Sequence, residues 1–325
     1  MTNLFDEMKA KVTGWDRKIV FPEALDERVL TAAGRLAEEG IVTPVLIGNM
    51  EEIQAKAKEL KVSLEKTEIY DPSRYVEFEE MVAAFVERRK GKVSEDDARK
   101  LLLTENYFGT MLVYMKKADG LVSGAVNSTA DTVRPALQII KMKEGLKKTS
   151  GVFIMVKEQE KYVFADCAIN IAPDSQDLAE IAVESAKTAK AFGIDPRVAM
   201  LSFSTKGSAV SDETKKVEAA LEIAKQLDPE LLIDGEFQFD AAIVPSVARQ
   251  KAPQSPIQGD ANVLVFPSLE AGNIGYKIAQ RLGGYEAVGP ILQGMNSPVN
   301  DLSRGCSSDD VYNLAVITAL QSINK

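Results

Sequence analysis

Short apolar runs alternate with amphipathic segments along almost the whole chain. The runs at residues 18–22, 43–47 and 120–124 are bounded by turn residues and have the length of buried strands. Each is followed by longer segments whose apolar residues recur at helical spacing. Parallel strands need a long connection between them, which a helix commonly provides. The alternation therefore predicts an α/β fold with mostly parallel sheets.

The same pattern extends to the C-terminus with one interruption. Two apolar runs at residues 151–156 and 162–165, joined by the charged KEQEK, predict an antiparallel hairpin. The remaining strands are expected at residues 198–203 and 262–266. Helices are expected at residues 26–39, 50–60, 75–90, 94–103, 106–117, 128–143, 175–192, 212–227, 239–247, 269–282 and 309–322.

The interruption near residue 144 predicts a domain boundary. A chain of 325 residues is long enough for two α/β domains. A turn rich in proline and asparagine at residues 296–300 resembles a crossing back to the first domain. We expect a discontinuous first domain of residues 1–143 plus 297–325, and a second domain of residues 144–296.

The absence of histidine from the sequence restricts the possible chemistry. It excludes Ser-His-Asp and Cys-His catalysis and every metal site that depends on histidine. The two cysteines, Cys167 and Cys306, are too few for a structural zinc site and indicate free thiols in a reducing compartment. We expect no bound metal or cofactor. Proton transfer would then fall to carboxylates, lysine, tyrosine or a thiol.

The charge of the chain bears on its partners. The net charge is −9, from 39 basic and 48 acidic residues, and the sequence contains no basic tract. Such a chain is a poor nucleic-acid binder, so a few local arginines must hold any anionic ligand. The N-terminal segment lacks the apolar stretch of a secretory signal, and no run approaches the ~20 apolar residues that span a bilayer. We expect a cytoplasmic protein with neither a membrane nor nucleic acid as partner.

The segment PVNDLSRGCSSDDV near the C-terminus is the densest group of chemically useful residues. Asn300, Ser303 and Arg304 lie in an irregular turn directly before a helix. Ser307 is a natural N-cap, and Asp310 three residues later completes a capping box. The free N–H groups of the helix and the Arg304 guanidinium together predict an anion site. A purely structural capping role for Asp310 explains the local sequence equally well.

The segment SGAVNSTADTVRP has a similar strand–loop–helix pattern. Ser128 and Thr129 supply hydroxyl groups for binding a substrate anion, and Asp131 can complete a second capping box. Arg134 precedes Pro135, which predicts a backbone outside ordinary helix geometry at this point. Capping alone is the commoner reason for such a pattern.

Three further residues have both a structural and a functional interpretation. Arg89 ends a predicted helix, where a basic residue also satisfies the helix dipole. Arg28 lies in a first helical turn, which is electrostatically unfavourable and favours an anionic partner. Cys167 follows an apolar strand and is most simply a buried small hydrophobe. The chain has neither a G-x-G-x-x-G nor a Walker A motif, so hydride transfer and nucleotide hydrolysis lack their usual signatures.

Segments distributed over the whole chain together resemble the phosphate acetyltransferases. They are IVFPEALDERVL, NYFGTMLV, STADTVRPALQII, SGVFIM, FADCAIN, SFSTKGSA, DGEFQFDAA, VFPSLEAGNIGYKI and PVNDLSRGCS. The resemblance implies two α/β domains with a cleft between them, similar to isocitrate and isopropylmalate dehydrogenases, and a homodimer. It also implies reversible acetyl transfer between acetyl-CoA plus phosphate and coenzyme A plus acetyl phosphate, as in acetate metabolism.

The resemblance assigns roles to the C-terminal turn. Asp310 matches the proposed general base that takes the proton of the coenzyme A thiol. Ser303 matches the residue thought to orient that thiol, and Arg304 matches the neighbour that contacts phosphate or developing charge. We expect direct thiolate attack in a ternary complex, because no histidine is present to activate a cysteine nucleophile.

The remaining matches concern substrate binding. Arg89 and Arg134 match further active-site arginines, Arg28 matches one linked to coenzyme A, and Cys167 matches a cysteine near the site that is not an essential nucleophile. The family commonly has a histidine directly before the Ser-Thr pair, but this chain has Asn127 there. An acid or base role is therefore excluded at that position, whereas hydrogen bonding is still possible.

Three alternative functions are compatible with the sequence. A phosphate butyryltransferase differs only in the width of the acyl pocket, which the sequence does not reveal. A dehydrogenase of the related fold would need metal-binding aspartates and a nicotinamide site. A non-catalytic regulatory module of the same fold would not need Ser303, Arg304 and Asp310 together.

Overall fold

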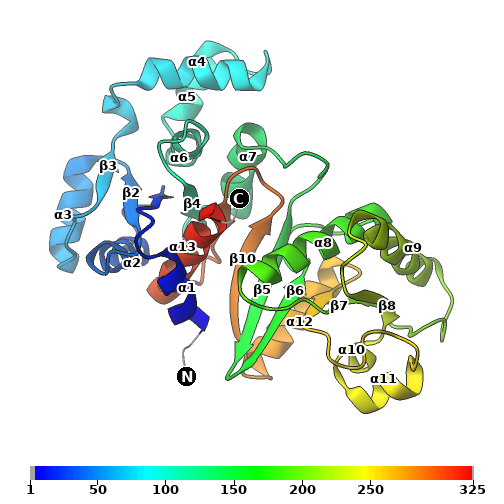
Figure 1. Ribbon diagram of the computed structural model, residues 1–325. Helices are drawn as coiled ribbons and strands as arrows, with labels where there is room; N and C mark the ends of the chain where they lie inside the picture. Colours follow the sequence, from blue (N-terminus) through cyan, green and yellow to red (C-terminus); the bar gives the residue numbers. More distant parts are fainter. Residues whose placement is uncertain (1–3, 324–325) are drawn as a thin grey trace. The chain divides into compact units, whose positions relative to one another are not determined.

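The computed structural model describes residues 4–323, and the chain divides into two compact units. Unit 1 contains Met1–Lys143 and Met295–Lys325, and unit 2 contains Glu144–Gly294. Each unit is built around its own sheet with helices packed on it (Figure 1). The prediction of an α/β protein with mostly parallel sheets is confirmed.

The sheet of unit 1 is parallel between all neighbours and has the order β11-β4-β1-β2-β3. Because the strands are parallel, the loops that follow β1, β4 and β11 leave the same edge of the sheet side by side. The strands are β1 (Lys18–Phe21), β2 (Thr43–Ile47), β3 (Glu68–Tyr70), β4 (Gly120–Ser123) and β11 (Val299–Asp301).

The helices of unit 1 include the last helix of the chain, which packs against α2 and β4. Ten of the sixteen residues of this helix are buried, so the C-terminal segment contributes to the core of the N-terminal unit. The helices are α1 (Leu4–Val12), α2 (Glu27–Glu38), α3 (Met50–Leu60), η1 (Pro72–Arg74), α4 (Phe78–Arg89), α5 (Glu95–Leu102), α6 (Glu105–Tyr114), α7 (Thr129–Ile139) and α13 (Ser308–Ile323).

The sheet of unit 2 is mixed and has the order β10-β5-β6-β9-β7-β8. β5 pairs antiparallel with both β6 and β10, which confirms the predicted hairpin, and the other neighbours are parallel. The strands are β5 (Ser150–Lys157), β6 (Glu160–Ala165), β7 (Val198–Leu201), β8 (Ile233–Phe237), β9 (Val263–Val265) and β10 (Glu286–Gln293). The helices are α8 (Ser175–Ala191), α9 (Asp212–Leu227), α10 (Phe239–Ile243), α11 (Pro245–Lys251) and α12 (Leu269–Arg281).

Two expectations about helices are wrong, and proline is involved in both. The single helix expected at residues 239–247 is two helices, because Pro245 cannot donate a helical hydrogen bond and instead begins α11. Pro135, in contrast, lies inside α7, so Arg134 is in a helix. The buried side chains of Val133 and Ala136 and the capped N-terminus hold α7 in place despite the lost hydrogen bond.

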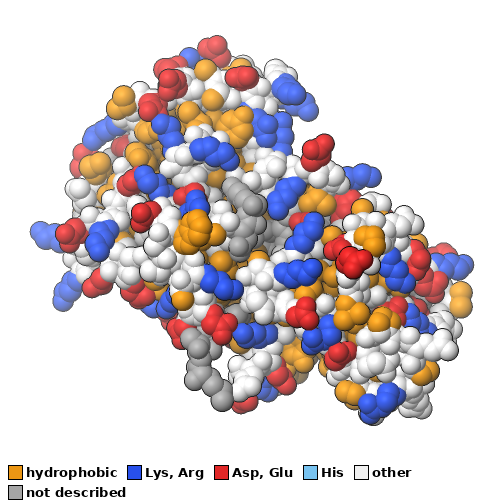
Figure 2. Space-filling model, viewed as in Figure 1, with side chains coloured by type: hydrophobic (Ala, Val, Ile, Leu, Met, Phe, Trp, Pro, Cys, Tyr) orange, Lys and Arg blue, Asp and Glu red, His pale blue; other side chains and the backbone are white. Residues whose placement is uncertain are grey.

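Charged side chains of both signs are mixed on the face of the molecule shown in Figure 2, where lysine and arginine are interspersed with aspartate and glutamate. Among residues 4–323, no helix is both long enough and apolar enough to cross a bilayer.

Candidate active site

Most of the predicted site residues lie in or beside three loops at one edge of the unit 1 sheet, either in the loop itself or in the helix or strand that adjoins it. One loop leads from β1 to α2, another from β4 to α7, and the third from β11 to α13. Parallel strands bring these three loops together although they are far apart in the sequence. The two motifs singled out from the sequence are therefore neighbours in the structure.

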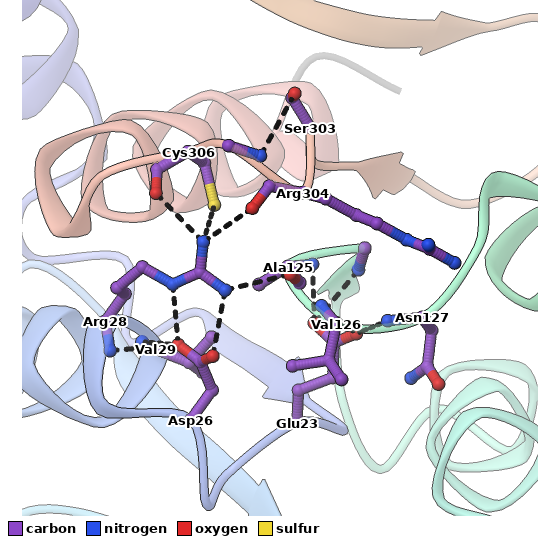
Figure 3. Close-up of polar contacts among 12 residues, drawn as sticks. Glu23, Asp26, Arg28, Val29, Ala125, Val126, Asn127, Ser303, Arg304 and Cys306 are labelled. Atoms are coloured by element: carbon purple, nitrogen blue, oxygen red, sulfur yellow. Dashed lines mark hydrogen bonds and ion pairs between the residues drawn. The ribbon is translucent and has the colours of Figure 1, made fainter.

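The turn before α13 has the predicted capping box. Asp310 Oδ2 accepts hydrogen bonds from Ser307 N at 2.8 Å and Ser307 Oγ at 2.9 Å, and Asp310 N donates to Ser307 Oγ at 3.2 Å. Ser303 and Arg304 precede this box and are exposed. Ser303 Oγ accepts a hydrogen bond from Gly305 N at 3.4 Å. The Arg304 side chain extends away from the other groups of its turn (Figure 3).

The start of α7 is built in the same way. Ser128 and Asp131 form the predicted capping box, with Ser128 Oγ donating to Asp131 Oδ2 at 2.6 Å. Hydrogen bonds from Ser128 lower the pKa of Asp131, and the charges of Arg134 and Arg304 lower it further. Both arginines therefore lie within electrostatic reach of one carboxylate.

Arg28 connects the loops at this edge of the sheet. Its Nε and Nη2 atoms donate to Asp26 at 3.0 and 2.9 Å, and this pairing is the main reason why the pKa of Arg28 is raised. Nη2 also donates to the carbonyl oxygen of Ala125 at 2.8 Å. Nη1 donates to the carbonyl oxygens of Arg304 at 2.8 Å and Cys306 at 3.1 Å. Asp26 is the N-cap of α2, which explains how an arginine is tolerated at a helix N-terminus.

Glu23 and Asp301 belong to the same region and were not predicted. Glu23 is 9% exposed, and its carboxylate accepts backbone hydrogen bonds from the loop after β4. Asp301 is 3% exposed and accepts a hydrogen bond from Thr129 Oγ1 at 2.6 Å. The one local signal for Glu23 is its position just after an apolar run. For Asp301, the one local signal is its position at the end of the segment PVND.

Burial raises the pKa of Asp301 to about 6. The hydrogen bond from Thr129 and the nearby Thr132 hydroxyl lower this pKa in part, whereas the negative charge of Glu23 raises it. The Oδ1 atom of Asp301 and the Thr132 hydroxyl both lack a close hydrogen-bond partner among residues 4–323. A carboxyl group at this position therefore titrates near neutral pH.

Some predicted residues lie elsewhere. Asn300 is fully buried, and its Nδ2 atom donates to Thr318 Oγ1 at 2.8 Å and Gln321 Oε1 at 2.7 Å, so its side chain is directed into the core rather than to the exposed groups. Arg89 ends α4 as expected and is half-buried. Its charge and that of Arg134 act on Tyr107, where they oppose the pKa increase that burial causes.

Both cysteine thiols are buried. Cys167 is fully buried in the core of unit 2, and burial raises its pKa well above the ordinary value. Cys306 is 8% exposed, and burial raises its pKa although Arg28 opposes the effect. Neither thiol is in a setting that would make it a reactive thiolate. Within the part of the chain that the structure describes, no group of three or more histidine, cysteine, aspartate or glutamate residues is arranged to hold a metal.

The fold and these groups define an α/β protein with exposed arginines, hydroxyl groups and a carboxylate at two capped helix N-termini. This set of groups suits an enzyme that transfers a group between anionic substrates. The model of the family described as "Phosphate acetyl/butaryl transferase" matches residues 3–319.

Individual relatives agree with the family match. The phosphate acetyltransferase of Bacillus subtilis (strain 168) is 71% identical over 323 residues, covering 99% of this chain and 100% of the relative. The crystal structure of a phosphotransacetylase from Streptococcus pyogenes has 57% identity and a TM-score of 0.97, with 100% of both chains covered. The chain therefore belongs to the phosphate acetyl/butaryl transferase family of acyltransferases, and the resemblance found in the sequence is confirmed.

A more distant likeness concerns the fold alone. A solved protein from Salmonella typhimurium, described as a 4-hydroxythreonine-4-phosphate dehydrogenase, has 13% identity and a TM-score of 0.54. The matched region covers 94% of this chain and 99% of that protein.

Proposed function

We propose that the protein is a phosphate acetyltransferase that moves an acetyl group between coenzyme A and inorganic phosphate. The observation that carries this proposal is the likeness to phosphate acetyltransferases over the whole chain. It is supported by Arg28, which joins the loop before Ser128 to the turn with Ser303 and Arg304 and so places anion-binding groups and a carboxylate at one edge of the sheet. The substrates are acetyl-CoA and phosphate in one direction, and coenzyme A and acetyl phosphate in the other.

The arginines would bind the phosphate group. A guanidinium group presents paired N–H donors that match the oxygen atoms of a phosphate. Arg134 and Arg304 are both exposed. Arg304 lies shortly before the N-terminus of α13, where backbone dipoles also favour an anion, whereas Arg134 lies in the middle of α7. Thr129 and Ser128 lie at the start of α7, and Arg89 acts on the same tyrosine as Arg134. We assign these residues to substrate binding.

The reaction would be a direct transfer in which Asp310 takes the thiol proton. The sulfur of coenzyme A attacks the acetyl carbon of acetyl phosphate, the C–S bond forms, and the C–O bond to phosphate breaks. Phosphate leaves as an anion held by arginines. An ordinary carboxyl has a pKa near ~4 and a thiol near ~8.5, so complete proton transfer before attack would cost roughly 6 kcal/mol. Proton transfer that accompanies attack avoids this cost.

A double displacement through an acetylated cysteine is the mechanistic alternative. Cys167 and Cys306 are buried and have raised pKa values, which disfavours both as nucleophiles. We therefore expect Cys167→Ala and Cys306→Ala to keep kcat within about fivefold of the parent enzyme. A loss of more than about a thousandfold from either variant would favour an acetyl-cysteine intermediate.

We also propose the broader organisation that the resemblance implies. The two units would correspond to domains of residues 1–143 plus 297–325 and 144–296, with a fold like that of isocitrate and isopropylmalate dehydrogenases and the substrates bound in a cleft. A homodimer is supported by α12 and the residue that caps its C-terminus, where Ile274, Ile278 and Leu282 recur every four residues and are exposed by 57%, 52% and 84%. The reduced state of both cysteines supports a cytoplasmic location.

The experiment that tests the function is an acyl-transfer assay with purified protein. Acetyl phosphate and coenzyme A should yield acetyl-CoA and phosphate without added metal. A kcat/KM for acetyl phosphate above that for butyryl phosphate separates the proposal from a phosphate butyryltransferase. Binding of coenzyme A without turnover would instead indicate a regulatory module, and a change in nicotinamide absorbance would indicate a dehydrogenase.

A further inference from the structure

The carboxylate of Glu23 holds the backbone of an entire loop. Its Oε2 atom accepts hydrogen bonds from the N–H groups of Gly124 at 3.0 Å and Ala125 at 2.8 Å. Its Oε1 atom accepts from Val126 at 3.0 Å and Asn127 at 2.7 Å (Figure 3). Hydrogen bonds to a charged acceptor are the strong class, and here four of them come from consecutive residues. The loop is thereby fixed directly before Ser128, the N-cap of α7.

The same loop approaches the turn before α13 very closely. Gly124 has a φ of +110°, a conformation that favours glycine. A side chain there would also meet Asp301 Oδ1 at 2.4 Å and the backbone N of Leu302 at 2.6 Å. A small displacement of residues 124–127 would therefore be transmitted to the turn that carries Ser303 and Arg304.

Arg28 joins this loop to the turn from the other side. A guanidinium group has five N–H donors. Here two are used by Asp26, one by the Ala125 carbonyl, and one each by the carbonyls of Arg304 and Cys306. Arg28 therefore has every donor engaged by acceptors of the described chain. A direct contact with coenzyme A would require one of these hydrogen bonds to break.

We propose that Glu23 and Arg28 are positioning residues that hold loop 124–127 and turn 304–306 in a fixed relation. Glu23 fixes the loop through its N–H groups, and Arg28 ties the carbonyl of Ala125 to those of residues 304 and 306. Arg304 lies in the turn, and Arg134 lies in α7, which follows the loop, so the placement of both arginines depends on this connection. Arg28 acts through the backbone, in place of the coenzyme A contact that the resemblance implies. This inference rests on the proposed acetyl transfer.

Kinetics with shortened thiol substrates distinguish the two roles of Arg28. Coenzyme A, dephospho-coenzyme A and pantetheine carry the same thiol but different numbers of phosphate groups. A residue that positions the reacting groups lowers kcat with all three thiols alike, because misplacement by about 1 Å can slow a reaction on the order of 100-fold. A residue that contacts the nucleotide part raises KM for coenzyme A and has less effect on pantetheine.

The variants are Glu23→Gln and Arg28→Lys, with Glu51→Gln and Arg74→Lys as matched controls. Glu51 and Arg74 form an exposed ion pair at 2.7 Å in the same unit. We expect kcat to fall about 10- to 100-fold in both test variants with every thiol, while KM for each thiol changes less than about threefold. A loss that disappears with pantetheine, or a kcat within about twofold of the parent, would overturn the proposal.

Hydrogen exchange supplies a readout that does not depend on activity. In the parent protein, the amides of residues 124–127 should be protected, and Arg28→Lys should speed their exchange together with that of residues 304–306. Rapid exchange of residues 124–127 in the parent would overturn the proposal even if a variant fails to fold. Protected amides in a protein without acetyl transfer would refute the proposed function and leave the connection between the two segments intact.

Discussion

The N-termini of α7 and α13 are built alike but have different surroundings. Ser128 with Asp131 and Ser307 with Asp310 each form an S-x-x-D capping box with closely similar hydrogen bonds. At the α7 end, the charges of Arg134 and Arg304 help to lower the pKa of Asp131. At the α13 end, the charge of Asp310 acts on the buried Cys306 thiol.

This difference indicates how two identical local motifs can have different roles. A carboxylate within reach of two guanidinium groups is held in its charged form and is a poor proton acceptor. Asp131 is therefore suited to the structural role of capping α7, at a helix N-terminus that would bind an anion. Asp310 follows the turn that carries Ser303 and Arg304, and the proposal gives it the proton. Because the two capping boxes have closely similar hydrogen bonds, substitution of each aspartate distinguishes the role of Asp131 from that of Asp310.

The largest expected effect is a loss of catalytic rate on substitution of Arg304, compared with substitution of Arg134. Arg304→Gln should lower kcat by about 1000-fold, because removing one donor that stabilises transition-state charge typically has an effect of that order. Arg134→Gln should mainly raise KM for phosphate, since we assign Arg134 to binding. Steady-state kinetics with Arg74→Gln as control would measure both. Equal and small effects at Arg304 and Arg134 would contradict a division of roles.

The next effect concerns Asp301, which lies between the two ends. Its folded pKa is about 6, above the ordinary value, so between roughly pH 4 and 6 the folded state holds a proton that the unfolded chain has released. Stability then falls as pH rises through this range. Replacing Asp301 with Asn removes this dependence.

The unfolding free energy of Asp301→Asn relative to the parent should therefore increase by about 2 kcal/mol between pH 4.5 and pH 8. Urea denaturation followed by circular dichroism at both pH values would measure the change. Asp240→Asn, an exposed carboxylate, is the control. A constant difference between Asp301→Asn and the parent across this range would show that Asp301 is not titrating abnormally.

The smallest effect concerns the caps themselves. Ser128→Ala and Ser307→Ala should each lower the unfolding free energy by about 1 kcal/mol, because each removes the hydroxyl that satisfies an N–H group of the first turn. Since the two boxes are alike, the losses should agree within about 0.5 kcal/mol. A loss at one helix only would mean that the boxes are not equivalent.

The fold was predictable wherever strands lie inside a sheet. Central strands such as β1 and β4 are buried and apolar, so their sequence pattern is strong. The strands that were not predicted, β3, β8, β10 and β11, all lie at the edge of their sheets. β8 in addition contains Asp234 and Glu236, which are buried against partners such as Lys206 and Ser204. Such partners lie far away in the sequence, so the local pattern did not indicate a strand.

The candidate site shows the same division between local and distant information. The capping boxes depend on residues three apart and were predicted correctly. The roles of Glu23 and Asp301 depend on partners about 100 and 170 residues away, as with Gly124 and Thr129. The side chain of Asn300 points into the core because it donates a hydrogen bond to Thr318 in α13. Only the folded arrangement supplies this information.

The central claim is that Asp310 accepts the thiol proton whereas Asp131 only caps a helix. The most direct test compares kcat for Asp310→Asn and Asp131→Asn in the same acetyl-transfer assay. We predict a loss of about 1000-fold for Asp310→Asn, with KM for coenzyme A within about threefold of the parent, and a loss below about tenfold for Asp131→Asn. Equal losses in the two variants would contradict the account and leave Asp310 with a capping role alone.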